Sequence, residues 1–302
     1  MKNKIISDLH ALEIKDIIEN EPLYKHTTFK VGGPALVFIE AHSFNDVTKT
    51  IDYALQYHIK YLIIGNGSNI LVSDKLFQGI VISTKYLNSF ELNDNYVYAM
   101  CGVNLIALAY HTAQASLSGM EFASGIPGCI GGSVFMNAGA YKKEMADIIK
   151  EVLVYDNHQL KWLDKAELAF SYRHSIFQER RDMVILAVNL ELEFACKEKI
   201  MELIETRKQK RQATQPYDAF CAGSTFKNPS IDTSSWQLID EANLRGYKIN
   251  DAQVSMKHSN FIINRDRASA KDVYDLINLV KKRVQEKANI TLHVEVELIN
   301  FE

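Results

Sequence analysis

The stretch Gly125–Tyr141 reads GIPGCIGGSVFMNAGAY and carries five of the fourteen glycines of the chain. Glycine allows positive φ and a close approach of the backbone to a ligand, and successive exposed N–H groups form a cradle for phosphate oxygens. Ser133 and Asn137 add a hydroxyl and an amide. A tight connection around a packed core would explain one such loop. A second loop, Gly65-Asn66-Gly67-Ser68-Asn69, has the same character, so the two together favour a large phosphate-bearing cofactor.

Neither loop fits the commonest phosphate-binding motifs. The dinucleotide fingerprint needs G-x-G-x-x-G between a strand and a helix. Gly65 and Gly67 begin that pattern, but Ile70 stands where the third glycine belongs. The G-x-x-x-x-G-K-[ST] pattern is absent from the sequence. The residues therefore indicate a diphosphate-binding surface that is neither of the Rossmann nor of the P-loop type.

Composition excludes several classes of protein. The 302 residues are 47% hydrophobic and 24% charged, with a net charge of −3, which gives no reason to expect nucleic acid or a membrane surface as partner. The N-terminus lacks the apolar core of a signal peptide, and no apolar run reaches transmembrane length. The four cysteines form no C-x-x-C pair, which disfavours a zinc site or a disulfide framework. We expect a cytoplasmic protein without a metal.

Hydrophobic periodicity predicts a mixture of helices and strands, of the α/β or α+β class. Helices are expected over 3–20, from Val47 behind a Ser43/Asp46 capping box, from Asn104 to Ala115, over Lys197–Arg211, near Ser234, and after a Ser269/Asp272 box. Strands are expected at 36–40, 61–64, 79–84, 95–101, 150–155, 183–194, 260–264 and 290–300. Composition shifts near Lys197, where a basic helix with Ile200, Leu203 and Ile204 on its inner face is predicted to connect two domains.

Three polar residues outside the glycine loops are candidates for chemistry. Arg173 lies in FSYRHSIF, Ser224 in AGSTFKNP and Glu295 in LHVEVELIN. Each also has an ordinary structural explanation: a surface ion pair, a hydroxyl that caps a turn, or a carboxylate that faces water. Glu297 shares the strand face of Glu295, and alternation alone does not choose between them. No His, Cys and carboxylate spacing predicts a metal site.

Seven blocks, taken in order, resemble the UDP-N-acetylenolpyruvoylglucosamine reductase family, in its shorter type II form. They are TTFKVGGPA, GNGSNILVSD, EFASGIPGCIGGSVFMNAGAY, SYRHSIF, AGSTFKNP, DAQVSMKHSNFIIN and HVEVELIN. The resemblance runs from about Thr27 to the C-terminus. It implies an α+β protein with a two-subdomain FAD-binding domain of the PCMH, or vanillyl-alcohol-oxidase, type over 1–196, divided into about 1–85 and 86–196. A C-terminal α+β substrate-binding domain would cover 197–302.

The resemblance also implies a reaction and its partners. NADPH would reduce non-covalently bound FAD, and hydride would pass from the flavin to the enolpyruvyl group of UDP-N-acetylglucosamine enolpyruvate, giving UDP-N-acetylmuramate for peptidoglycan synthesis. Arg173 and Glu295 would stabilise the enolate or enol, and Ser224 would donate the proton. The expected enzyme is a cytoplasmic monomer.

The family motifs assign the binding residues by position. Those expected to bind FAD are Thr28, Val31, Gly32, Gly33, Gly65, Asn66, Gly67, Ser68, Asn69, Gly125, Pro127, Gly128, Gly131, Gly132, Ser133, Asn137 and Gly139. Those expected to bind the substrate are Tyr172, Lys227, Asn228, His258 and Asn260. The choice of Glu295 over Glu297 rests on this pattern alone.

Two other functions remain open at this point. Another flavin enzyme of the same fold, such as an alcohol or sugar oxidase, would keep the glycine loops but would not need AGSTFKNP with a distant glutamate. A non-enzymatic module that binds a nucleotide sugar would require the Arg173, Ser224 and Glu295 set to be incidental. Bound flavin colour would count against the second of these.

Overall fold

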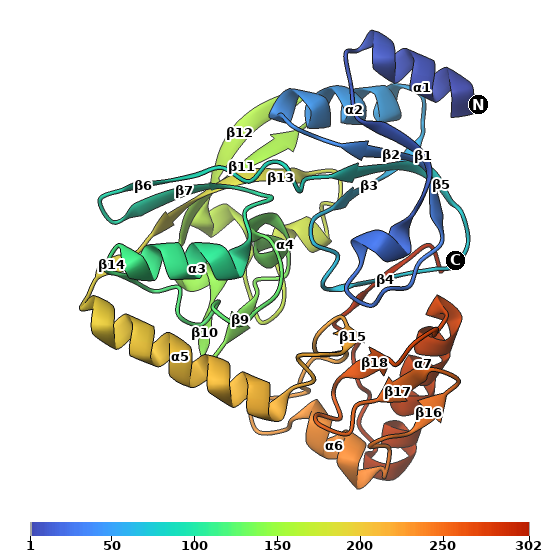
Figure 1. The fold of residues 1–302 in the computed structure, drawn as a ribbon, viewed down its shortest axis with the longest axis vertical. Coiled ribbons are helices and arrows are strands. Elements are labelled where there is room, and N and C mark those ends of the chain that lie inside the picture. The colour runs from blue at the N-terminus through green and yellow to red at the C-terminus, as the bar shows by residue number, and fades with distance from the viewer. Residues whose placement is uncertain (1, 302) are drawn as a thin grey trace. The chain divides into compact units, whose positions relative to one another are not determined.

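A computed structural model describes residues 2–301, which form two compact units (Figure 1). Unit 1 contains the chain up to Asn20, Leu36–Asn66 and Gln78–Gln209, and unit 2 contains Glu21–Ala35, Gly67–Phe77 and the chain from Lys210. Two short N-terminal segments thus belong to the same unit as the C-terminal part of the chain. The reason is packing: Phe29, Val31 and Leu71 are buried in the hydrophobic core of unit 2. The expected domain divisions at about residues 85 and 197 stay a prediction.

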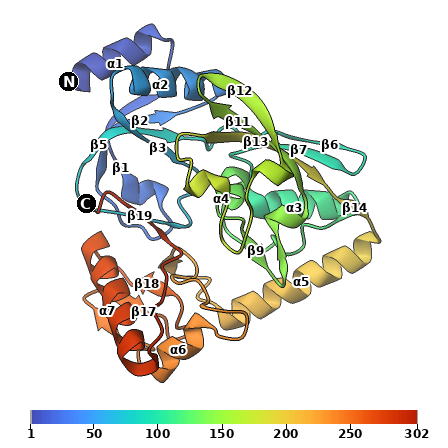
Figure 2. The same cartoon turned by 180° about the vertical axis from the view of Figure 1, so that it is seen from behind.

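A four-stranded sheet forms one part of unit 1, in the order β1 (Ile17–Pro22), β2 (Pro34–Glu40), β5 (Phe77–Ser83), β3 (Lys60–Ile64). Helices α1 (Lys2–Ala11) and α2 (Phe44–Gln56) lie beside it (Figures 1 and 2). The Ser43/Asp46 capping box of α2 is confirmed. The expected helix over 3–20 is wrong beyond Ala11, because Glu13 takes a left-handed φ of 68° and the chain then enters β1.

A five-stranded antiparallel sheet forms the other part of unit 1. Its order is β12 (Gln159–Asp164), β11 (Ile149–Asp156), β13 (Val184–Glu191), β7 (Tyr96–Met100), β6 (Phe90–Asn93). The edge strands β6 and β12 were not expected from the sequence, since most of their side chains are exposed and they lack a buried apolar run. Helix α3 (Leu105–Gln114) begins at Asn104, whose side-chain oxygen accepts the N–H of Ala107 at 2.9 Å, as expected.

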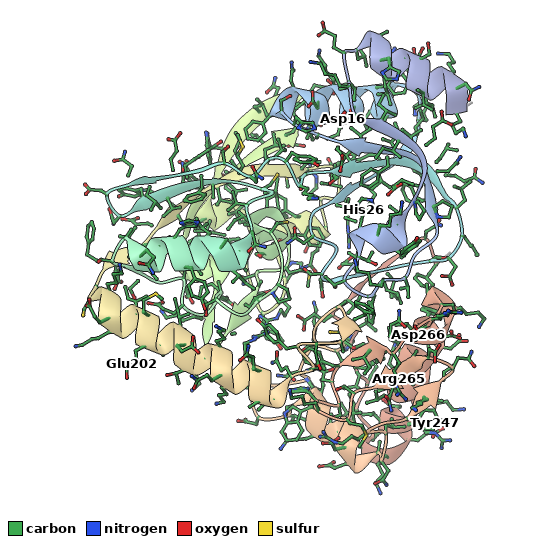
Figure 3. All side chains as sticks on the ribbon, viewed as in Figure 1. Asp16, His26, Glu202, Tyr247, Arg265 and Asp266 are labelled. Carbon is green, nitrogen blue, oxygen red and sulfur yellow. The ribbon has the colours of Figure 1, made fainter. Side chains whose placement is uncertain are left out.

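Shorter elements complete unit 1. Helix α4 (Ile130–Phe135) lies inside the long glycine stretch, which then enters the hairpin of β9 (Gly139–Ala140) and β10 (Lys143–Glu144). A second pair joins β8 (Leu117–Ser118) to β14 (Glu193–Phe194). Helix α5 (Lys197–Thr214) follows as expected, and it buries Ile200 and Ile204. Leu203, expected on the same inner face, is 40% exposed, and Glu202 projects from the helix (Figure 3).

Unit 2 is built on a small antiparallel sheet, β15 (Phe220–Cys221), β18 (Ile262–Asn264), β17 (Ala252–Val254), β16 (Lys248–Ile249). Helix α6 (Ser235–Glu241) and the long helix α7 (Ala270–Ala288) pack with it. The Ser269/Asp272 capping box of α7 is confirmed. So is its buried apolar stripe, which consists of Val273, Leu276, Ile277, Val280 and Val284.

A parallel pair joins the early and late parts of unit 2. Strand β4 (Ile70–Val72) pairs with β19 (Glu297–Ile299), so the expected terminal strand over 290–300 is shorter than predicted. The mixture of helices with largely antiparallel sheets confirms the expected α+β class. Within residues 2–301, no helix is long and apolar enough to cross a membrane, and no group of His, Cys, Asp and Glu could hold a metal ion.

Candidate functional site

Cys129 connects the two glycine loops within unit 1. It precedes α4 and is 3% exposed. A Cβ built on Gly65 would lie 2.2 Å from Cys129 Sγ, so the first loop passes directly over the sulfur. Burial raises the pKa of the Cys129 thiol, while hydrogen bonds from the N–H groups of Gly132 and Asn66 oppose that shift. The structure therefore brings Gly65 and Asn66 beside the start of α4.

Close packing explains why glycine stands at two other positions of the second loop. A Cβ on Gly131 would lie 2.9 Å from the Cβ of Cys101, and one on Gly139 would lie 2.5 Å from Lys143 O. Gly132 differs, because it is exposed and its nearest neighbour would be Cys129 Sγ at 3.7 Å. Gly132 is thus exposed at the surface, while its N–H is used by the Cys129 thiol.

The polar side chains of the second loop are used within the chain. Ser133 is buried, and its hydroxyl donates to Cys129 O at 2.8 Å. Asn137 is 0% exposed, and its amide bonds two backbone groups, Ser171 O and the Ala146 N–H. Of the remaining expected FAD contacts in this loop, Gly125 and Gly128 are buried and Pro127 is exposed.

The remaining residues expected to bind FAD lie in unit 2. The N–H and hydroxyl of Thr28 both donate to Gly67 O, at 3.1 and 3.3 Å. Gly67 has a φ of 60°, and a Cβ there would lie 2.1 Å from His26 O. A Cβ on Gly33 would lie 2.3 Å from Asp74 O. Of the other expected contacts here, Val31 is buried in the core, whereas Gly32, Ser68 and Asn69 are half-buried.

Ser224 and Glu295 lie on neighbouring segments of unit 2. The N–H of Glu295 donates to Thr225 O at 2.8 Å, and the N–H of Lys227 donates to His293 O at 2.9 Å. Asn69 Nδ2 donates to Glu295 O at 3.1 Å, which adds the first glycine loop to the same group. Both Ser224 and Glu295 are half-buried. Gly223, with a φ of 74°, makes the turn that precedes the serine.

Asn260 holds the segment after Ser224 in place. Its Nδ2 donates to Phe226 O at 2.8 Å, and its Oδ1 accepts the Phe226 N–H at 3.0 Å. The N–H of Thr225 donates to Asn260 O at 2.7 Å. Asn260 is 4% exposed, so its amide serves the backbone beside Ser224. Thr225, which the sequence did not single out, joins the Asn260 and Glu295 backbones.

Arg173 lies in unit 1, in the short turn Ser171–His174. Its φ is 54°, a left-handed conformation that is uncommon for a residue with a side chain. Its guanidinium lies 5.0 Å from the centre of the Tyr172 ring, and Nη2 donates to Gly139 O at 2.7 Å. Tyr172 is 49% exposed. The turn thus presents an aromatic ring and a guanidinium together, which suits recognition of an anionic group.

His258 lies among aromatic side chains in unit 2. Its ring centre is 5.0 Å from that of Phe261 and 6.3 Å from that of Trp236. Burial lowers the pKa of His258, and the nearby charge of Arg245 lowers it further. Its buried Nδ1 has no hydrogen-bond partner among residues 2–301. Of the other expected substrate contacts, Asn228 accepts the Ser235 N–H with Oδ1 at 3.1 Å, at the start of α6.

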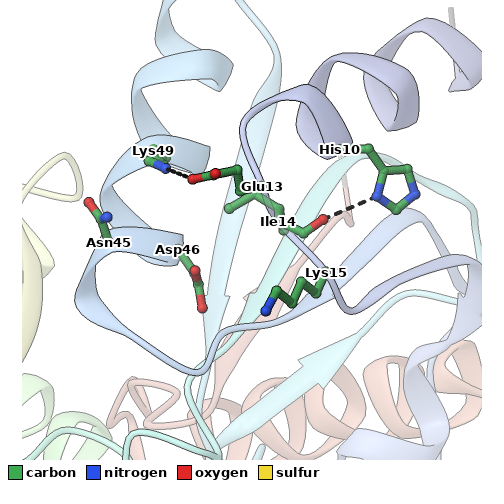
Figure 4. A pocket seen from close by; sticks show the side chains of 7 residues that line it. All are labelled: His10, Glu13, Ile14, Lys15, Asn45, Asp46 and Lys49. Carbon is green, nitrogen blue, oxygen red and sulfur yellow. Dashed lines mark hydrogen bonds and ion pairs between the residues drawn. The ribbon is translucent and has the colours of Figure 1, made fainter.

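A polar pocket of about 640 Å³ lies elsewhere in unit 1 (Figure 4). None of the expected site residues lines it; the lining residues are His10, Glu13, Ile14, Lys15, Asn45, Asp46 and Lys49. Lys49 Nζ is bound to Glu13 at 3.3 Å, and Asp46 belongs to the cap of α2. Lys49 and Asp46 are thus used in contacts within the chain, and the pocket contains none of the residues expected to bind FAD or substrate.

Comparison with known proteins identifies the family. The model of an FAD binding domain matches residues 35–158. The model described as UDP-N-acetylenolpyruvoylglucosamine reductase, C-terminal domain, matches residues 215–299. The chain is 42% identical over 298 residues to the UDP-N-acetylenolpyruvoylglucosamine reductase of Bacillus subtilis, covering 98% of each. The chain belongs to the UDP-N-acetylenolpyruvoylglucosamine reductase family.

Solved structures agree with this family. A crystal structure of the reductase from Thermus caldophilus matches with a TM-score of 0.80 and 33% identity, covering 94% of this chain and 98% of that one. A glucose dehydrogenase, Phl p 4.0202, matches with a TM-score of 0.50 and 14% identity over 64% of this chain and 44% of that one, which shows a shared fold alone. Membership in the reductase family confirms the resemblance found in the sequence, the oxidoreductase class and the FAD-binding domain.

Proposed function

We propose that this protein reduces UDP-N-acetylglucosamine enolpyruvate to UDP-N-acetylmuramate, with NADPH as the electron source and FAD as the carrier, in peptidoglycan precursor synthesis. One observation carries the proposal: a relative with this name aligns over 98% of both chains at 42% identity. The match includes both the FAD-binding region and the C-terminal region. A reaction that needs both regions is therefore favoured over one that needs a flavin domain alone.

The residues of unit 1 fit a bound FAD. The first loop at Gly65 and Asn66 meets the second loop at Cys129, and Gly132 lies exposed beside them. Glycines of this kind let the backbone come close to the diphosphate of FAD. When bound, FAD supplies a two-electron carrier between NADPH and the enolpyruvyl double bond. Cys129 is buried, which is consistent with cofactor held without a covalent bond.

We assign the chemistry at the substrate to three side chains. Arg173 stabilises the negative charge that develops on the carboxylate-bearing fragment, since a guanidinium offers paired donors in a fixed plane. Glu295 stabilises the enol form, and Ser224 gives its proton to the carbon that hydride addition leaves electron-rich. The neighbouring backbone segments of Ser224 and Glu295 support this assignment.

The other substrate contacts expected from the sequence are kept as proposals, and Asn260 alone is given an indirect role. Tyr172, Lys227, Asn228 and His258 are proposed to contact the UDP-sugar. Asn260 is proposed to act through the backbone it holds. We propose that the protein works as a monomer in the cytoplasm without a nucleic-acid or membrane partner. Its net charge of −3 supports the last part of this proposal, since it gives no general attraction to polyanions.

Absorption spectroscopy tests the proposal in three steps. The purified protein should be yellow, should lose its flavin absorption when NADPH is added without oxygen, and should regain it when UDP-N-acetylglucosamine enolpyruvate follows. Failure of the substrate to restore the colour would reject the proposed substrate. If the protein instead consumes oxygen with sugars or alcohols, and the enolpyruvyl substrate does not reoxidise the flavin, an oxidase is favoured.

A further inference from the structure

Asn137 makes two hydrogen bonds that both end on the backbone of unit 1. Its side chain is completely buried. Nδ2 donates to Ser171 O at 2.9 Å, and Oδ1 accepts the Ala146 N–H at 2.9 Å. A buried amide that lost these partners would leave polar groups unsatisfied, which is costly. The side chain is therefore fixed by the fold and turned toward the segment that contains Arg173.

Ser171 is the first residue of the turn that carries Arg173. The turn is closed by two backbone bonds, from Ser171 N–H to His174 O at 3.2 Å and from His174 N–H to Ser171 O at 3.0 Å. Arg173 lies inside it with a φ of 54°. Such a conformation persists only where surrounding contacts hold it, and it is concentrated at functional sites. The bond from Asn137 reaches the closing carbonyl of this turn.

The same stretch also holds the guanidinium. Arg173 Nη2 donates to Gly139 O at 2.7 Å, two residues after Asn137. On the other side of the turn, Gln178 Nε2 donates to both Arg173 O and Phe135 O at 3.1 Å. The backbone and the charged end of Arg173 are thus both fixed to the segment that runs from α4 into the β9–β10 hairpin (Figure 1).

We infer that Asn137 is a positioning residue for Arg173 and does not contact FAD. This inference rests on the proposed function, in which Arg173 acts on the substrate. Asn137 holds the Ser171 carbonyl, the turn then holds Arg173 in its left-handed conformation, and Gly139 receives the guanidinium. The second glycine loop therefore has two tasks: its early part, around Gly132, faces the cofactor, and its end sets the direction of the arginine.

Two variants of Asn137 separate this role from a cofactor contact. Asn137→Ala removes both bonds, whereas Asn137→Asp keeps an acceptor for the Ala146 N–H but loses the donor to Ser171 O. In both, flavin reduction by NADPH and the FAD dissociation constant should change by less than about threefold. Reoxidation by UDP-N-acetylglucosamine enolpyruvate should slow by about 10- to 100-fold, because a displacement of about 1 Å at a reacting group can cost that much.

A control variant and a double variant complete the test. Asn95→Ala removes a bond of the same type in unit 1, from Nδ2 to Leu192 O at 3.0 Å, and should leave both half-reactions unchanged. In the Arg173→Ala background, Asn137→Ala should slow reoxidation no further. Hydrogen exchange of the His174 amide should be faster in Asn137→Ala than in the wild-type protein, a readout that needs neither cofactor nor substrate.

The possible failures are distinguishable. If Asn137→Ala weakens FAD binding about tenfold or more while the FAD-loaded protein reoxidises normally, Asn137 is a cofactor contact and the inference is wrong. The inference is also wrong if Asn137→Ala slows reoxidation as much in the Arg173→Ala background as it does in the wild-type protein. If Arg173→Ala itself leaves reoxidation unchanged, the proposed role of Arg173 fails and the inference fails with it, whereas the proposed substrate is retained.

Discussion

Gly65 and Cys129 come from different loops and lie so close together that the glycine has no space for a side chain. A Cβ on Gly65 would lie 2.2 Å from Cys129 Sγ, a separation that real Cβ atoms do not show. The sulfur is fully enclosed and receives N–H groups from both loops. The packing of Gly65 against Cys129 therefore requires that residue 65 carry no side chain.

Gly65→Ala should destabilise the protein by about 1–3 kcal/mol, the usual cost of extra volume in a packed region. Gly132→Ala is the matched control, because its Cβ would meet the same sulfur at an ordinary 3.7 Å, and it should cost less than about 0.5 kcal/mol. Adding Cys129→Ala to Gly65→Ala should recover part of the loss. Urea unfolding of the four proteins measures this, and equal stabilities for the two glycine variants would contradict it.

Ser224→Ala should leave flavin reduction by NADPH nearly unchanged and slow reoxidation by the substrate about 100- to 10,000-fold, the typical loss for a positioned general acid. The serine lies beside Thr225, whose carbonyl accepts the Glu295 N–H. Ser230→Ala, an exposed serine of the same loop, is the control. Stopped-flow measurement separates the half-reactions. Equal slowing of both by Ser224→Ala would mean that the hydroxyl is structural.

Gly223→Ala tests the turn that precedes Ser224. Gly223 has a φ of 74°, and within residues 2–301 no atom beyond its own chain neighbours lies within 4 Å of the position of a Cβ there, so the cost is conformational. Gly223→Ala should be about 1–2 kcal/mol less stable than the wild-type protein. Gly223→Asn should lose less stability, because asparagine tolerates this conformation. Denaturant unfolding gives both values. An asparagine variant less stable than the alanine variant would refute this explanation.

The stability of the protein should depend on His258 as the pH is lowered through about 6.5. Burial places the folded-state pKa of His258 below its ordinary value, which is about 6.5, so protonation favours the unfolded chain. The contribution is fully present above pH 6.5 and declines as the pH falls toward the lower folded-state pKa. His258→Gln should therefore lose less unfolding free energy than the wild-type protein over this range. Urea titrations at several pH values measure the unfolding free energy of both proteins. An equal loss in both as the pH falls would argue against the prediction.

FAD should be released completely when the protein is precipitated with acid. The reason is that Cys129, the cysteine within the second glycine loop, is buried and hydrogen-bonded by backbone groups, so it is not available to attach a flavin. The yellow colour should appear in the supernatant, where its absorbance can be compared with that of the intact protein. Colour that stays in the pellet would point to a covalent bond.

Local patterns allowed part of this fold to be predicted from the sequence. The Ser43/Asp46 and Ser269/Asp272 boxes fix helix starts because their bonds lie within one turn. The stripe from Val273 to Val284 predicts a buried face for the same reason, since helical periodicity is local. The ordered motifs predicted the family, which the comparisons confirm. The left-handed residue at Glu13 had no such signal, and there the prediction failed.

The sequence by itself determined the family, the α+β class and the helices with clear caps, because each depends on residues close together or on an ordered set of motifs. Only the tertiary structure decided that Phe29 and Leu71 belong to the core of unit 2, that the Thr225 segment lies beside Glu295, and that Asn137 holds the turn of Arg173. These relationships join residues far apart in the chain. Packing and backbone hydrogen bonds select them, and neither leaves a local pattern in the sequence.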